Sequence, residues 1–443
     1  MKTLCKLTAC SCVLISLLPL SALASANTEL LFELRERIES QQNMNDKFYG
    51  TAPKTGEASD SYLLSRLRIG LIHRFNDEFK IKLSLQDSRA IDWAFQDSNW
   101  TNSEFGKQEN NPQHDPLELG ETFIEYRSPY GFLSKLGRQS IYYGNKRVFG
   151  PGAWKNSGKW VWDAARIGFK KEKNWLEAFY GKSMLHDPNQ FSLDHRHGFT
   201  GGALYAHMQL DSAWALEPML ISKYNDSSQD YETKDLYYYG ARALYKGKGI
   251  KLDATYLQQK GHVRQSGTTR IQSNAIGYHL DLDYRFNPRW LLGAIYAYAS
   301  GDDKNTAENE RFDGVYGASD KYYGRMNLMA WSNLKDLGLL ANYRPNRDWQ
   351  VQAEYHQFHA DRINDKWRAY KTGLQAQSDH YGNELDLTAQ YHFAPSWKFA
   401  AGVGLFLPGE AIRQAIDNNQ PNLSDDPAYS GFFQVEYKFK QTL

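Results

Sequence analysis

The sequence predicts an all-β fold, a transmembrane antiparallel β-barrel of about 18 strands with short turns at one end and long loops at the other. Three observations predict it. Apolar and polar residues alternate from Leu30 to Phe439 in segments of roughly ten residues, the length of a tilted membrane strand. Tight turns and long polar connections alternate between these segments. No apolar run reaches the roughly 20 residues of a spanning helix, since residues 290–299 form one of the longest.

Residues 1–26 have the pattern of a secretory signal peptide. Lys2 and Lys6 precede an apolar stretch, and small residues follow at the spacing of a cleavage site near Ala26. Residues 27–443 should then form one barrel domain, exported to the bacterial outer membrane. All three cysteines lie in the signal segment, so the mature chain should contain no disulfide and no thiolate metal site.

Period-two alternation locates the strands. It is clear where Phe79, Ile81, Leu83 and Leu85 alternate with polar residues, because neighbouring side chains of a strand point to opposite faces. One series should contact lipid and the other the lumen. The predicted strands are 30–38, 62–73, 79–89, 117–127, 132–141, 160–170, 174–182, 199–210, 213–224, 236–246, 250–260, 273–284, 289–300, 334–344, 349–360, 381–392, 397–407 and 430–440.

The connections between these strands predict the orientation of the barrel. Short links fall at one end, which should be periplasmic, and long polar links at the other, which should be extracellular. The short links include 76–78, 128–130, 211–212, 247–249, 287–288 and 345–347. The long ones include 39–61, 90–116, 142–159, 301–333, 361–380 and 408–429. If the pore is narrowed, these long loops must fold inward.

Composition and motifs exclude several other classes. The mature chain would carry a formal charge of −1, because the signal removes two lysines from a total of +1, so a nucleic-acid partner has no support. Mean hydropathy is −0.65, which suits strands that have one face in water. No nucleophile elbow, zinc-protease helix or phosphate loop is present, although a barrel enzyme or surface receptor stays an alternative.

The predicted lumen-facing positions are rich in arginine and lysine. Guanidinium groups bind carboxylates through two parallel hydrogen bonds, and rings of cations favour the passage of anions. The alternative is a balanced lumen, in which Glu33, Glu121, Glu125, Asp281 or Glu384 cancels these charges in cross-strand pairs. The predicted basic positions are Arg35, Arg37, Arg66, Arg68, Lys80, Lys82, Arg127, Arg138 and Arg166.

Three segments resemble the signatures of the alginate export outer-membrane porin family. The first runs from Leu136 to Gly150 and continues to Arg166, the second from Phe312 to Leu334, and the third from Gly382 to Glu410. The resemblance implies an eighteen-stranded porin whose arginine-rich conduit, narrowed by loops, passes an anionic polysaccharide. It implies that Arg138, Arg147 and Arg166 line the basic path, with Lys159 as a further basic position and Gln139, Asn156 and Asp163 as polar neighbours that orient them.

The function predicted is therefore an outer-membrane channel with a basic lumen for an anionic, alginate-like polysaccharide or its oligosaccharides. A general or small-solute anion porin is the alternative. Expected partners are membrane lipid and lipopolysaccharide, the saccharide, and periplasmic secretion or uptake components, with a monomeric barrel. No cofactor is expected. The aspartate-rich loops 301–305 and 422–426 could hold calcium and His195 and His197 a metal, but solvated loops are the simpler interpretation.

Overall fold

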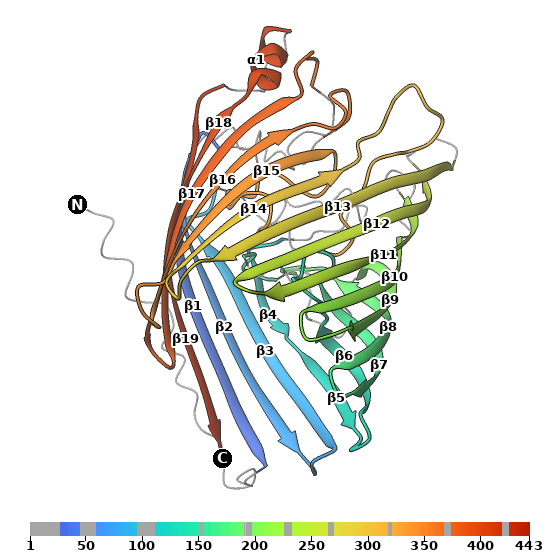
Figure 1. Ribbon diagram of the computed structural model, residues 1–443. Helices are drawn as coiled ribbons and strands as arrows, with labels where there is room; N and C mark the ends of the chain where they lie inside the picture. Colours follow the sequence, from blue (N-terminus) through green and yellow to red (C-terminus); the bar gives the residue numbers. More distant parts are fainter. Residues whose placement is uncertain are drawn as a thin grey trace, which may run out of the picture.

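One closed antiparallel sheet makes up almost the whole molecule (Figure 1). The computed structural model describes residues 27–44, 59–94, 111–150, 152, 154–158, 160–189, 191, 197–225, 233–264, 270–317, 321–366, 374–418 and 425–443. The first strand pairs with the second and also with the last, with Glu33 opposite both Arg68 and Lys438. The predicted signal peptide and Lys159 lie outside the described residues.

The described chain contains nineteen strands and one helix. The first ten strands are β1 (Thr28–Gln42), β2 (Asp60–Arg74), β3 (Phe79–Ile91), β4 (Asp115–Leu119), β5 (Thr122–Arg127), β6 (Phe132–Ser140), β7 (Val161–Lys171), β8 (Asn174–Met184), β9 (His197–Gln209) and β10 (Trp214–Asn225). The remaining elements are β11 (Thr233–Gly247), β12 (Ile250–Arg264), β13 (Ile271–Arg285), β14 (Trp290–Ala299), β15 (Leu334–Tyr343), β16 (Trp349–His359), β17 (His380–Ala394), β18 (Trp397–Pro408), α1 (Glu410–Asp417) and β19 (Ala428–Thr442).

The barrel has eighteen wall positions, because β4 and β5 are two pieces of one strand that both pair with β3. The predicted eighteen-stranded antiparallel barrel is thus confirmed. The predicted strand 117–127 breaks at Gly120, where the backbone lies very close to β3. The Gly120 N–H donates to the Ser84 carbonyl oxygen at 2.9 Å, and a Cβ at Gly120 would lie 2.6 Å from Ser84 Oγ.

Four of the short turns share one hydrogen-bonding pattern. In the turn before β14, the side-chain oxygen of Asn287 accepts the backbone N–H groups of Arg289 and Trp290 at 2.8 and 2.9 Å. Asparagine and aspartate favour such turns because their side chains reach the backbone two or three residues further on. The pattern of Asn or Asp followed three residues later by an aromatic residue recurs at Asn76, Asp211 and Asn346. These turns lie where the sequence predicts them, at the same end as the C-terminus (Figure 1).

The outer face carries the apolar half of each alternating strand. Leu83 and Leu85 on β3 are 51% and 42% exposed, as expected of side chains whose neighbour is lipid. Trp–Tyr pairs ring the end with the short turns, with centroid separations of 4.5 Å for Trp290 and Tyr343 and 4.6 Å for Trp349 and Tyr391. Aromatic residues concentrate at such membrane interfaces. Among the described residues, no helix has the length and apolarity to cross a membrane.

Two further features differ from the prediction. Several strands extend beyond the predicted bounds at the loop end, such as β1, which continues to Gln42, because backbone pairing persists after the apolar alternation stops. The region 408–429, predicted as loop, contains α1, whose Ala411, Ile412 and Ala415 form a buried stripe at helical spacing.

Candidate functional site

Two loops fold into the barrel and meet inside it. One connects β6 to β7 (loop 141–160) and the other connects β14 to β15 (loop 300–333). Phe149 forms a parallel bridge with Tyr316. The Gly150 N–H donates to the Tyr316 carbonyl oxygen and the Tyr316 N–H to that of Val148, each at 3.2 Å. The expected narrowing of the pore by inward-folded loops is therefore present.

Aromatic rings fill the space where the loops meet the wall. Phe149 and Tyr316 are fully buried and lie 5.7 Å apart, and Tyr316 contacts Trp162 of β7 edge-on at 4.8 Å. Such edge-on ring pairs stabilise by about 0.5–1.5 kcal/mol beyond the area they bury. The second of the three family-like segments supplies Tyr316, so its conspicuous aromatic residues form an internal core.

Loop 300–333 also contacts wall strands other than the two that it connects. Asp313 lies 2.6 Å from the Lys223 ammonium group of β10 and accepts a hydrogen bond from the Tyr238 hydroxyl of β11. Burial alone would raise the pKa of Asp313, but Lys223 and Lys234 outweigh it and hold the pKa at about 2. Further along the loop, the N–H of Met326 donates to Glu384 on β17 at 2.8 Å. The loop therefore bridges the lumen.

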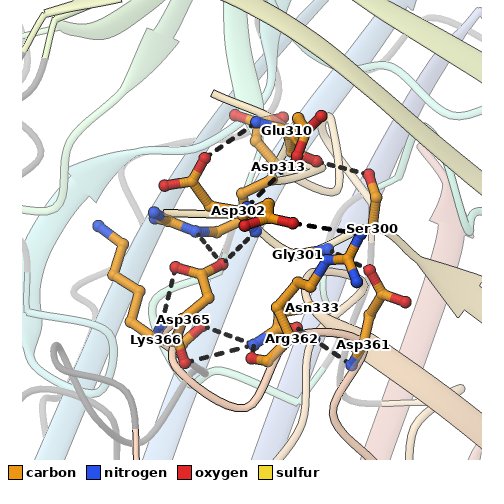
Figure 2. Close-up of polar contacts among 12 residues, drawn as sticks. Ser300, Gly301, Asp302, Glu310, Asp313, Asn333, Asp361, Arg362, Asp365 and Lys366 are labelled. Carbon is orange, nitrogen blue, oxygen red and sulfur yellow. Dashed lines mark hydrogen bonds and ion pairs between the residues drawn. The ribbon is translucent and has the colours of Figure 1, made fainter. Parts of the chain in front are cut away.

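Figure 2 shows how loop 300–333 is fixed to the loop between β16 and β17. Asn333, fully buried, accepts the N–H groups of Asp361 and Arg362 at 3.1 and 2.8 Å and donates to the Arg362 carbonyl oxygen at 3.0 Å. The Asp302 N–H donates to the Asp365 carboxylate at 2.9 Å. These contacts satisfy the backbone groups of both loops, as buried polar groups require.

Nine cations on the lumen side of β1–β3 and β5–β7 form what we call the basic wall. They share carboxylates such as Glu33, which lies 2.5 Å from Arg66 and 3.4 Å from Arg68. The cations are Arg35, Arg37, Arg66, Arg68, Lys80, Lys82, Arg127, Lys135 and Arg166, and their carboxylate partners are Glu33, Glu39, Glu121, Glu125 and Glu177. The cations outnumber these partners, so the wall keeps an excess of positive charge.

An acidic wall lies on the other strands. Its carboxylates are Glu217, Asp253, Asp281, Asp336, Glu354, Glu384 and Asp386, on β10, β12, β13 and β15–β17. Arg242 of β11 contacts Glu217 at 2.7 Å and Asp253 at 2.5 Å. The loops add Arg147 and Arg325, which pair with Asp281 and Glu354. Asp281 and Glu384 therefore do not neutralise the positive charge of the basic wall. Glu33, Glu121 and Glu125 neutralise part of it.

Loop 141–160 covers the part of the basic wall nearest the long loops. Arg37 lies under Trp154, with its guanidinium carbon 3.9 Å from the ring centroid, and Arg35 donates to the Asn156 side-chain oxygen at 2.9 Å. The Asn156 amide in turn donates to the carbonyl oxygens of Ser65 and Arg89 at 2.9 and 3.1 Å. Asn156 is fully buried and thus holds the loop against β2 and β3, besides contacting an arginine as the resemblance implies.

The part of the basic wall nearest the short turns is open to the lumen. The side chains of Arg68, Lys80 and Lys82 are 39%, 23% and 17% exposed, and that of Arg127 is 61% exposed. Arg166, 18% exposed, pairs with Glu177 of β8. These predicted basic positions are brought together on one side.

Arg138 and Asp163 form an ion pair within the barrel wall, and Arg138 is only 6% exposed, so its predicted role in lining the basic path stays a prediction. Arg138 lies opposite Asp163 and two residues from Leu136, which is 62% exposed on the lipid-facing surface. The two are ion-paired at 2.7 Å, and Arg138 reaches Glu118 of β4 at 3.0 Å, beside the break between β4 and β5. Arg138 thus joins three strands.

Gln139 and Arg147 face inward, but their side chains bind other parts of the protein. Gln139, fully buried, donates to the Ala164 carbonyl oxygen at 2.9 Å. Arg147 lies 2.7 Å from Asp281, with its guanidinium carbon 4.2 Å from the centroid of the Tyr322 ring. Burial would lower the pKa of Arg147, but Asp281 outweighs burial and raises it. Arg147 holds its loop to β13 and does not line an open path.

Sequence reasoning missed several residues that shape the lumen. Lys135 was not among the predicted positions, although it follows the alternation of lumen positions on β6; Glu121, predicted as a cancelling charge, pairs with Lys82. The roles of Asp313 and Arg325 depend on loop paths that no local pattern encodes. In the predicted calcium loop, Asp302 pairs with Lys304, and Asp303 accepts the Asn305 N–H at 3.0 Å. The described residues contain no cluster of three metal-ligating side chains.

Comparisons with known proteins agree with this architecture. A family model described as alginate export matches residues 28–424. The alginate production protein AlgE of Pseudomonas aeruginosa is 26% identical over 182 residues, which are 35% of this chain and 36% of that protein, so the match spans about a third of the relative.

Solved structures are similar in fold. Pseudomonas aeruginosa OccK8 (OprE) has a TM-score of 0.60 at 9% identity, covering 94% of this chain and 98% of that one. Acinetobacter baumannii OccAB2 has a TM-score of 0.59 at 12% identity, covering 93% and 98%. At these identities the likeness shows the fold alone. Because the family model matches nearly the whole barrel, the chain belongs to the alginate export family.

Proposed function

We propose that this protein is an outer-membrane channel that passes an anionic polysaccharide, or its oligosaccharides, along the basic wall. The observation that carries the proposal is the separation of charge inside the barrel. Arg68, Lys80 and Lys82 remain accessible on one side, while the acidic wall lies on other strands. An excess of fixed cations lowers the electrostatic cost of bringing a carboxylate into the pore. The family supports a uronate polymer as the class of cargo.

A small-solute anion porin is the second candidate. It would share the basic wall but would need no binding of sugar rings. The interlocked loops around Tyr316 favour the first candidate, because loops that narrow the lumen restrict the passage of mixed small solutes.

Ion selectivity tests the proposal. In planar bilayers under a salt gradient, the wild-type reversal potential should indicate anion preference, and millimolar hexuronate oligomers should reduce the current. The triple variant Arg68→Gln, Lys80→Gln, Lys82→Gln should shift the reversal potential toward cations.

The matched control replaces three exposed cations outside the lumen, Arg89→Gln, Lys171→Gln and Lys248→Gln, and should leave the reversal potential unchanged. A cation-preferring wild-type pore whose current ignores the oligomers would overturn the proposal. Anion preference without any effect of the oligomers would favour the small-solute porin.

A further inference from the structure

A cavity of about 310 Å³ lies at the periplasmic end, between the turn that joins β5 to β6 and the start of β8. Its lining includes Arg127, Gly168, Lys170, Trp175 and Glu177. The register places these side chains on the lumen face, since Lys170 lies opposite Trp175 and Gly168 opposite Glu177. The volume lies at the small end of ligand pockets, which span roughly 300–1,000 Å³.

Trp175 is the last ring of a nearly parallel row. It stacks with Tyr205 at 5.6 Å and 14°, with His207 at 6.0 Å and 10°, and with Tyr143 at 5.7 Å and 28°. Toward β7 the next lumen-facing position after Lys170 is Gly168, and the Glu177 side chain lies over it, since a Cβ there would be 2.8 Å from Glu177 Cγ. The half-buried indole borders the cavity, which we call the slot and whose lining also includes Phe132 and Phe169.

The charges around this slot favour an anion. Glu177 is engaged by Arg166, which donates to it from Nε at 2.9 Å. The Arg127 side chain is 61% exposed. Lys170 is exposed, and in the described part of the chain its ammonium group has no ion-pair partner. Lys170 thus lies beside the aromatic face together with Arg127, whose guanidinium is exposed and also paired with Glu125 at 2.6 Å.

We propose that the slot binds one ring of a hexuronate, with the pyranose stacked on Trp175 and the carboxylate held by Lys170 or Arg127. The C–H groups of a pyranose face carry partial positive charge, which suits the negative face of an indole, and an ammonium or guanidinium group suits the carboxylate. The site rests on the proposed function and deepens it. It is a periplasmic binding position below the interlocked loops.

Calorimetric titration of the detergent-solubilised protein tests the site without requiring an open pore. The probes are a hexuronate trimer and a neutral glucose trimer. Trp175→Ala should weaken binding of the uronate trimer roughly tenfold, and Trp175→Phe, which keeps a smaller ring, about threefold. Trp349→Ala, which removes an indole from the membrane interface, is the control and should change nothing.

The charge is tested separately. Lys170→Gln should weaken binding of the uronate trimer about fivefold and leave binding of the neutral trimer unchanged. Its neighbour Lys171, on the opposite face of β7, provides the matched control Lys171→Gln. Equal losses for both trimers would overturn the assignment of Lys170 to the carboxylate.

The two proposals fail in different ways. An anion-selective pore whose uronate affinity is the same in wild type, Trp175→Phe and Trp175→Ala would overturn the slot and leave the channel function standing. A pore without anion preference that still binds the uronate trimer through Trp175 would overturn the function and leave the slot. Absence of any uronate binding to the wild type would overturn the slot.

Discussion

Arg147 Nη2 lies 2.7 Å from the carboxylate of Asp281, a residue 134 positions further along the chain. Arg147 is fully buried, and this contact joins loop 141–160 to β13 across the lumen. Buried ion pairs offset the cost of desolvation only when both partners are present, so this pair is sensitive to the loss of either one.

Arg147→Gln should release the loop. Removing one partner of a buried pair typically costs about 3–5 kcal/mol, because the other charge stays unpaired. We expect larger and more variable single-channel conductance in bilayers. Arg270→Gln, which removes half of the exposed pair between Arg270 and Asp235, is the control and should cost about 0–1 kcal/mol. Wild-type conductance in Arg147→Gln would show that the pair does not hold the loop.

Arg138 and Arg166 should behave differently, although the family resemblance treats them alike. Arg166→Gln should lower anion preference, because Arg166 belongs to the basic wall. Arg138→Gln should leave the reversal potential unchanged and lower the resistance of the barrel to heat in detergent, because Glu118 and Asp163 lose their common partner. A changed reversal potential in Arg138→Gln would contradict a purely structural role for this buried residue.

Asp313 makes the docking of loop 300–333 sensitive to acid. Its pKa is lowered from 3.8 to about 2, so docking stabilises the ionised carboxylate. That contribution, about 2 kcal/mol, is fully present above pH 4 and is lost as the pH falls through 2. Conductance should therefore be constant from pH 7 to about 4 and change between about 4 and 2. Asp313→Asn should remove this transition; a transition of unchanged size in the variant would assign it to another group.

Asn333 should control how firmly loop 300–333 is fixed to the loop after β16. Asn333→Ala leaves the N–H groups of Asp361 and Arg362 without their acceptor, at a cost of about 1–3 kcal/mol for each buried group. We expect faster tryptic cleavage after Arg362 in the folded barrel. The neighbouring Ser332→Ala is the control. Equal cleavage rates in both variants and in the wild type would exclude this role.

The barrel could be predicted because the residues that determine each strand and each short turn lie close together in the sequence. Each strand needs one apolar face, and turn-forming residues such as Asn287 mark the short links, so alternation and turn chemistry together set the number of strands and their direction. The break at Gly120 escaped prediction, because it depends on contact with Ser84 on the neighbouring strand.

The candidate site could be predicted only in part, for the same reason. Arg66 and Lys82 were placed in the lumen by period two alone, and the register agrees. At Arg138, period two could not predict the contacts with Glu118 and Asp163, because these partners lie on other strands. Arg147 and Asn156 were recognised as important, but their framework roles follow from loop contacts with β13 and β2 that lie far away in sequence.

The separation of the two charged walls has a consequence for counterions. A polyanion travels with neutralising cations, and a uniformly basic tube would strip them away and build up an opposing potential. The acidic wall gives those cations no open path, because Glu384 and Asp386 are 0% and 1% exposed and accept backbone N–H groups of loop 300–333. Under the proposed function, the accessible cations Arg68, Lys80 and Lys82 would take the place of the counterions, and passage of the polyanion would carry net current.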